Sequence, residues 1–139
     1  MTLILRFRSY DLPPTTHATL LASAHSLGAE SVRHIGAEYC FYIEASRDLR
    51  SDELGILEWL LAETFEPQSF GTSSFLDARG TILEVGPRMT FTTAWSTNAV
   101  SICNACGIDA ITRIERSRRY LLDTPREMSE GAQTAFLAN

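Results

Sequence analysis

The fold is decided by DARGTILEVGPR (residues 77–88), WSTNAV (95–100) and RIERSRRY (113–120). Residues 81–85 alternate as a strand does, and Ser96 is placed to cap the helix that follows. Gly107 stands just after the last apolar position of that helix, where helices commonly end. Residues 109–122 predict a long and strongly basic strand. We therefore expect one unbroken strand–helix–strand unit.

The segment before this unit repeats the same order of elements. Residues 2–9 alternate between apolar and polar side chains, which predicts a half-buried strand. A hydroxyl of Thr15-Thr16 can cap a helix that Gly28 ends. Residues 31–45 are rich in β-formers and predict a long second strand, with a bulge or bend at Gly36. Strand, helix and long strand therefore occur twice.

A further helix and a connection separate the two copies. Ser51 precedes two acidic residues that suit a helix start, and Trp59 is expected to anchor the edge of that helix. Residues 66–74 are rich in turn formers and predict the connection. The apolar stripe of the helix is formed by Leu54, Leu57 and Leu61.

The predicted fold class is α/β (α+β), an antiparallel or mixed sheet packed by about three helices. We place a domain at residues 1–123, with internal halves at about 1–64 and 75–123. Residues 124–139 are thin in apolar side chains and predict the start of an interdomain linker, with a weak helix.

Composition excludes some classes of function. The chain has 139 residues, with 12 Lys and Arg against 17 Asp and Glu, so its formal net charge is −5. A general nucleic-acid binder or a binder of anionic membranes would need a basic face, so we expect neither partner. No apolar run approaches the roughly 20 residues of a membrane helix, and the alternating start does not resemble a signal peptide.

The cysteines and histidines predict no metal or redox site. Three cysteines cannot all pair within the chain, so a reducing cytoplasm is the simplest location. Cys103 and Cys106 have the spacing of a metal or redox pair, but they fall inside the predicted helix without a second pair. We expect them to pack in the core. No nucleophile has both a base and an orienting group, so no catalytic residue is assigned.

Two stretches allow both a structural and a binding interpretation. The charges of residues 113–119 need partners if the strand is buried, so we expect this stretch to project beyond the core. It is either a solvated strand end or a surface that docks an acidic domain through arginine. The loop around Arg88 joins an arginine to a helix start, which is either a capped helix at a domain interface or an anion site.

The three ordered blocks EVGPR (84–88), WSTNAV and RIERSRRY resemble signatures of the N-terminal domain of phosphoribosylformylglycinamidine synthase in its large single-chain form. This family is also called formylglycinamide ribonucleotide amidotransferase. Residues 37–39 and the helix at 52–61 look similar but looser. Ala94 departs from the family, whose members often have proline there. The resemblance implies a pseudo-dimer of the small subunit found in multi-subunit versions, which agrees with the doubled order of elements.

The resemblance also implies a role within a larger enzyme. That enzyme would be an ATP- and magnesium-dependent ligase of de novo purine biosynthesis, with glutamine as amido donor. This domain would hold no cofactor and no catalytic residue, and would be inactive alone. Its partners would be the synthetase and glutaminase domains of the same polypeptide, which it would bridge while supporting ammonia transfer. The expected domain-interface residues are Arg88, Trp95, Ser96, Thr97, Asn98, Arg116, Arg118 and Arg119.

Three other classes of protein are alternatives to this interpretation. A stand-alone ferredoxin-like module for ligand sensing or interaction would bind a small anion tightly at the loop of Arg88 and Ser96. An RNA-binding domain would need an aromatic and basic strand pattern that is missing here. A free-standing small subunit would hold one copy of the unit instead of two. We also expect that the isolated chain can self-associate, because separated interface domains expose apolar patches.

Overall fold

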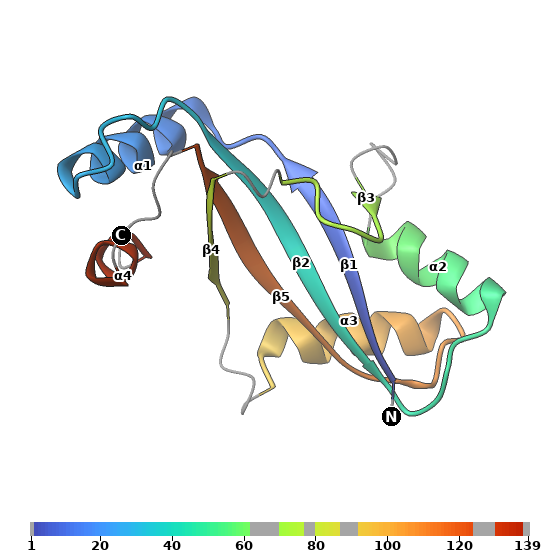
Figure 1. Cartoon of the computed structure of the whole chain (residues 1–139). Helices are drawn as coiled ribbons and strands as arrows, with labels where there is room; N and C mark the ends of the chain where they lie inside the picture. Colours follow the sequence, from blue (N-terminus) through green and yellow to red (C-terminus); the bar gives the residue numbers. More distant parts are fainter. Residues whose placement is uncertain (1, 62–69, 77–79, 87–91, 124–129, 138–139) are drawn as a thin grey trace.

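The computed structural model describes residues 2–61, 70–76, 80–86, 92–123 and 130–137, and it confirms the α+β class. Within these residues the elements follow one another as two strand–helix–strand–helix units joined by a two-residue strand (Figure 1). The first unit is β1 (Thr2–Tyr10), α1 (Pro14–Ser26), β2 (Ile35–Ala45) and α2 (Ser51–Leu61), followed by β3 (Phe70–Gly71). The second is β4 (Thr81–Val85), α3 (Ala94–Ala105), β5 (Ile111–Leu122) and α4 (Glu130–Leu137).

The described strands form one antiparallel sheet in the order β3-β1-β2-β5-β4. The two long strands β2 and β5 lie at its centre, and each has the first strand of its own unit on its outer side. The doubled arrangement expected from the sequence is therefore present as two units side by side. It extends further than predicted, since α4 follows β5 as α2 follows β2.

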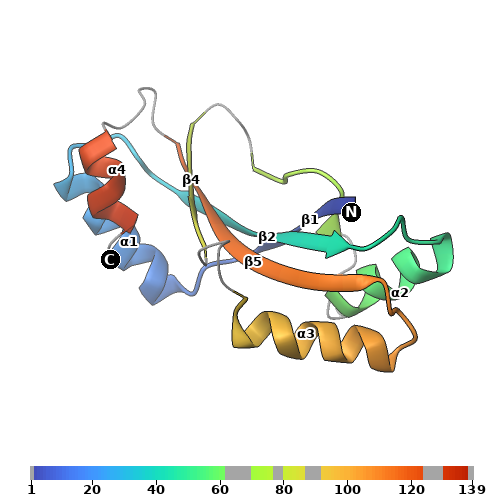
Figure 2. The same ribbon diagram turned by 90° about the horizontal axis from the view of Figure 1, so that it is seen from below.

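The described helices cover one face of the sheet in two pairs (Figure 2). The pair of α1 and α4 packs over Ile35, Tyr120 and Leu122 at one end. The pair of α2 and α3 packs over Ile43 and Ile114 at the other end. Residues 72–76, which follow β3, lie over the opposite face, where Ser74 and Phe75 bind Glu38 (Figure 2). The middle of the helix-bearing face lies between the two pairs.

Several local predictions are corrected by the first unit. The helix α1 begins with Pro14 at its first turn and has no side-chain cap, so capping by Thr15-Thr16 is wrong. Proline suits this position because its fixed φ already matches the helix. The second strand is shorter than predicted, and β2 pairs without a bulge at Gly36. Gly28, at φ 96°, ends the first helical segment as predicted.

Glu53 holds the start of the helix α2, where the sequence predicted acidic residues. Arg47 donates to both carboxylate oxygens of Glu53 at 2.8 and 2.9 Å, and the backbone N–H of Arg50 donates at 2.9 Å. The hydrogen bonds from Arg47, and then from the Arg50 backbone, hold the pKa of Glu53 at about 2. Leu57 and Leu61 are buried as expected, but Trp59 is 61% exposed and does not anchor the helix edge.

Two glycines let β4 approach β5 closely. A Cβ at Gly80 would lie 2.2 Å from the carbonyl oxygen of Leu122, and one at Gly86 would lie 2.7 Å from Ser117 Cβ. Side chains at these positions would push the strand away, which explains glycine in the block that opens the second unit. Gly107, at φ 89°, ends α3 as predicted.

A single irregularity sets the faces of β5. Glu44 and Ala45 of β2 lie opposite Arg113 and Ile111, so Thr112 is an extra residue in β5. Its hydroxyl donates to the Glu44 carbonyl oxygen at 3.2 Å. This β-bulge allows Ile111 to join the core beside Ile114 although the two are three residues apart.

The predicted helix after residue 124 is present as α4. Phe136 of α4 is buried and lies edge-on to Tyr120, with ring centroids 6.5 Å apart. The predicted boundaries of the domain, its halves and the linker stay predictions.

Candidate functional site

The strands separate charge between the two faces of the sheet. The register places Arg6 and Arg8 of β1 opposite Phe41 and Tyr39 of β2, on the helix-bearing face. Arg116 and Arg118 of β5 lie opposite the same two aromatic residues from the other side. The glutamates of the described strands, Glu38, Glu44, Glu84 and Glu115, all alternate onto the opposite face.

Arginine and aromatic side chains meet between the two helix pairs. We name this group the arginine–aromatic surface and define it by Arg8, Tyr10, Tyr39, Trp95, Arg116 and Arg118. The guanidinium carbon of Arg116 lies 4.6 Å from the ring centroid of Tyr39 and 5.0 Å from that of Trp95. Two cation–π contacts therefore hold the plane of this guanidinium.

The other members of the surface surround Tyr39. Tyr10 stacks on it with ring centroids 4.4 Å apart, and the Arg8 guanidinium lies 4.9 Å from its ring. Burial raises the pKa of Tyr10, so its hydroxyl stays neutral. Arg8 Nη1 also donates to the Leu61 carbonyl oxygen at the end of α2, at 3.2 Å. Arg118 is exposed at the rim.

Trp95 reaches the surface because Thr93 starts the helix α3. Thr93 is the N-cap, and its side-chain oxygen accepts from the Ser96 N–H at 3.1 Å. Capping by Ser96 is therefore wrong. Ser96 is fully buried, and its Oγ accepts from the backbone N–H of Ile114 at 3.0 Å, which ties α3 to β5. The first turn of α3 then places Trp95 6.2 Å from the ring of Phe41.

The charges of β5 on the opposite face are paired inside the domain. Glu38 is completely buried and accepts from Arg119 Nη1 at 2.9 Å, Ser74 Oγ at 2.7 Å and the Phe75 N–H at 2.8 Å. Glu84 receives hydrogen bonds from Tyr42 and from Ser117. The expectation that this stretch projects beyond the core is wrong, because β5 is a central strand with partners for its buried acids.

Glu115 joins the cap of α3 to the same strand. It is buried and accepts from the Thr93 hydroxyl at 2.7 Å, the Thr93 N–H at 3.2 Å and Arg113 Nε at 3.0 Å. Because Glu38, Glu84 and Glu115 are each met by several donors, these three acids form a structural network on this face.

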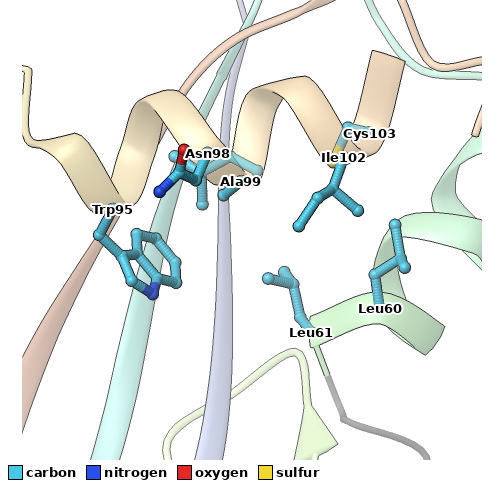
Figure 3. A pocket seen from close by; sticks show the side chains of 8 residues that line it. Leu60, Leu61, Trp95, Asn98, Ala99, Ile102 and Cys103 are labelled. Atoms are coloured by element: carbon cyan, nitrogen blue, oxygen red, sulfur yellow. The ribbon is translucent and has the colours of Figure 1, made fainter. Parts of the chain in front are cut away.

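An apolar cavity of about 230 Å³ adjoins Trp95 (Figure 3). In Figure 3, Trp95, Ala99 and Ile102 of α3 face Leu60 and Leu61 of α2 across it. Asn98 contributes a polar group to the lining, and Cys103 and Ile114 complete it. Trp95 therefore lines the cavity and also contacts Arg116.

The predicted interface residues fall into separate places. Trp95, Arg116 and Arg118 come together, whereas Arg119 lies on the other face in the Glu38 network. Thr97 and Asn98 are exposed on α3, and Ser96 is internal. Arg88 lies outside the described residues. Reasoning from the sequence missed Arg8, Tyr10 and Tyr39; the alternation of the first strand was visible, but its pairing with β2 was not.

The cysteines and histidines form no recognisable metal or redox centre in the described residues. Cys103 is buried as predicted, and burial raises the pKa of its thiol. Core packing is wrong for Cys106, which is exposed because it is the C-cap residue at the end of α3. His17 and His34 have ring centroids 5.1 Å apart, and His17 Nε2 accepts from the Ile35 N–H. No described helix is long and apolar enough to span a membrane.

Comparison with known proteins identifies the family. Residues 38–139 match the family model described as formylglycinamide ribonucleotide amidotransferase N-terminal. The chain is 43% identical over 130 residues to a probable phosphoribosylformylglycinamidine synthase, chloroplastic/mitochondrial, of Arabidopsis thaliana, which covers 89% of this chain. It is 44% identical to the phosphoribosylformylglycinamidine synthase of Dictyostelium discoideum and 31% identical to that of Homo sapiens, over 84% and 75% of this chain.

The chain spans only a small part of these relatives. The matched region is 9% of the Arabidopsis and Dictyostelium proteins and 8% of the human protein. The name of the plant relative gives it an organellar location, so the cytoplasmic location stays a prediction for this chain. The match over most of the residues, together with the doubled fold, shows that this chain belongs to the formylglycinamide ribonucleotide amidotransferase N-terminal family.

Proposed function

We propose that the chain is the non-catalytic N-terminal domain of a phosphoribosylformylglycinamidine synthase and acts in de novo purine biosynthesis. The observation that carries the proposal is the match to relatives of that name, of which this region is about a tenth or less. The three free cysteines suit the reducing cytoplasm in which we place the polypeptide.

In this proposal the remainder of the polypeptide performs the chemistry. A glutaminase domain releases ammonia from glutamine, and a synthetase domain uses ATP and magnesium to convert formylglycinamide ribonucleotide to its amidine. The present domain contacts both, keeps them aligned and supports the transfer of ammonia between them. Its buried acids already have several internal donors each, which suits a structural role better than a catalytic one.

The arginine–aromatic surface is the part of this domain best suited to such contacts. Aromatic residues and arginine are enriched at protein interfaces, and arginine pairs carboxylates through two hydrogen bonds at once. The Glu38 network lies on the other face, and its buried side chains are expected to support the fold instead.

The test compares two rates of the full-length enzyme. Arg116→Ala with Arg118→Ala should lower the glutamine-dependent rate severalfold while the rate with added ammonia is kept. Arg33→Ala is the matched control, because Arg33 is an exposed arginine away from the surface. Unchanged proportions of the two rates in the double variant would contradict a role in coupling.

The reading frame beyond Asn139 provides an independent test. A continuation with a nucleotide-binding site and a glutaminase cysteine would support the proposal. A stop codon shortly after Asn139 would contradict it and favour the stand-alone binding module.

A further inference from the structure

We propose that Trp95 joins the arginine–aromatic surface and the neighbouring apolar cavity into one docking surface for a peptide segment. The segment would be continuous and would carry carboxylates beside a large apolar side chain. This inference rests on the proposed function, in which other parts of a longer polypeptide contact this domain.

The cationic half of the surface is preorganised. Arg6, Arg113 and Arg119 each form an ion pair with a glutamate at 2.9 to 3.0 Å. In the described residues, Arg116 and Arg118 form no such pair. The rings of Tyr39 and Trp95 fix the plane of the Arg116 guanidinium. A carboxylate that binds its N–H groups therefore costs little conformational entropy of the Arg116 side chain.

Charge complementarity favours an acidic occupant. The chain as a whole is acidic at −5, yet the described strands β1, β2, β4 and β5 present no acidic residue on the helix-bearing face. The acids of these strands lie on the opposite face, where arginines of β5 meet them, and Glu58 of α2 is paired with Arg6 on the helix-bearing face. A negatively charged segment therefore finds the arginines of this face without strand acids that would repel it.

The apolar cavity beside Trp95 is large enough for one apolar side chain of a partner. Its volume of about 230 Å³ is below the size typical of a small-molecule site, and its lining is almost entirely aliphatic and aromatic. Ile102 at its edge is 54% exposed. An apolar anchor from a partner would cover Ile102 and Trp95 and remove them from water, as at the centre of protein interfaces.

The aromatic rings argue against a nucleotide as the occupant. Tyr39 is already contacted by Tyr10, Arg8 and Arg116, and Trp95 by Phe41 and Arg116. Their faces are thus engaged within the domain, whereas recognition of a base needs a ring face on which it can stack. The N–H edges of the guanidinium groups are better suited to carboxylates.

The first test measures peptide binding by the 139-residue chain. Trp59→Phe leaves Trp95 as the single tryptophan, because the chain has two. Its fluorescence is followed while the peptide EEFLEE is added, with QQFLQQ, EEGSEE and inorganic phosphate as separate probes. We expect EEFLEE to bind at least about tenfold more tightly than either altered peptide, which corresponds to roughly 1.4 kcal/mol.

Matched variants locate the binding. Arg116→Gln should weaken EEFLEE binding about tenfold, the effect expected for one charge-assisted contact. Arg33→Gln removes the same charge elsewhere and should leave it unchanged. Arg118→Gln alters an exposed side chain and therefore tests the surface even if Arg116→Gln perturbs folding. Equal binding of EEFLEE and QQFLQQ, saturation by phosphate alone, or equal effects of Arg116→Gln and Arg33→Gln would overturn the proposal.

The second test uses the full-length polypeptide. A photo-cross-linking benzoylphenylalanine replaces Asn98 beside the cavity, and the same residue replaces exposed Ala18 on α1 as the control. We expect the Asn98 position alone to cross-link to a segment with acidic and large apolar residues. Cross-links to a segment without acids, to a second copy of this chain, or to nothing would overturn the proposal.

The two proposals can fail separately. If EEFLEE binding depends on Arg116 but the glutamine and ammonia rates keep their proportion, the docking surface stands and the coupling role fails. If the proportion changes while EEFLEE does not bind, the coupling role stands and this docking surface is wrong.

Discussion

Replacing Glu38 with alanine is expected to destabilise the domain more than most single substitutions. The Glu38 side chain is fully buried and accepts hydrogen bonds from Arg119, Ser74 and the backbone of Phe75. Glu38 therefore connects the central strand β2 to Ser74 and Phe75, which lie over the face of the sheet opposite the helices. The variant removes the carboxylate but leaves the donors in place.

The loss of stability in Glu38→Ala depends on the contacts that Arg119 keeps. Removing one partner of a buried ion pair typically costs about 3–5 kcal/mol, because the other charge stays buried. Arg119 keeps Glu84, whose Oε1 lies 3.4 Å from its Nε and is partly exposed, so we expect about 3 kcal/mol. A domain of this size usually has about 5–15 kcal/mol in total, so much of the stability would be lost. The melting temperature should fall by roughly 10 °C.

Urea unfolding followed by circular dichroism measures this change. Glu38→Gln keeps the shape and an acceptor for the Phe75 N–H, so it should cost less than alanine. Glu30→Ala is the control at an exposed acid. A double-mutant cycle with Arg119→Met isolates the pair, with an expected coupling of about 1–3 kcal/mol. A loss below about 1 kcal/mol for Glu38→Ala, or additive changes in the cycle, would refute this account of the network.

Three further predictions concern acid stability, thiol reactivity and glycine packing. The pKa of Glu53 is about 2 in the folded chain against an ordinary 4.5, so its stabilising effect is complete above pH 4.5 and is lost as the pH falls towards 2. In Glu53→Gln, the free energy of unfolding should therefore fall less between pH 4.5 and pH 2 than in the unmodified chain, as measured by unfolding curves at several pH values. The same fall in both proteins would contradict this prediction. Cys106 should be the one thiol of three that reacts with Ellman's reagent before unfolding, since the other two are buried; fast reaction of two or more would argue otherwise. Gly86→Ala should cost about 1–3 kcal/mol because its Cβ meets β5, whereas Gly55→Ala, with open space in α2, should add about 0.5–1 kcal/mol; the same thermal shift in both variants would count against the packing explanation.

Local patterns in the sequence predicted the elements well where one residue decides a local conformation. Gly28 and Gly107 both adopt positive φ at helix ends, as their positions indicate. The start of α3 was harder, because hydroxyl side chains stand at both Thr93 and Ser96. Only the tertiary bond from the Ile114 N–H to Ser96 Oγ decides that Ser96 is internal and Thr93 is the cap.

The candidate site could be predicted only in part for the same reason. Trp95, Arg116 and Arg118 stand in blocks that attract notice in the sequence, and the structure brings them together. Arg119 looks equivalent in sequence, but its neighbour in space is Glu38, which lies 81 residues away. The pairing of β2 and β5 determines which arginine meets the buried Glu38, and no local pattern contains that information.

The extra residue at Thr112 has a consequence for how the length of this domain can change. Residues 113–119 of β5 alternate between Ile114, Arg116 and Arg118 on the helix-bearing face and the side chains that meet the acids on the opposite face. Inserting or deleting one residue there would therefore exchange the two faces. Arg116 and Arg118 would then face glutamates that already have partners, and Glu115 would face the aromatic residues of the helix-bearing face. Length changes before the bulge leave this alternation intact. Insertions and deletions among relatives should therefore collect in the α3–β5 turn and be selected against within the following strand.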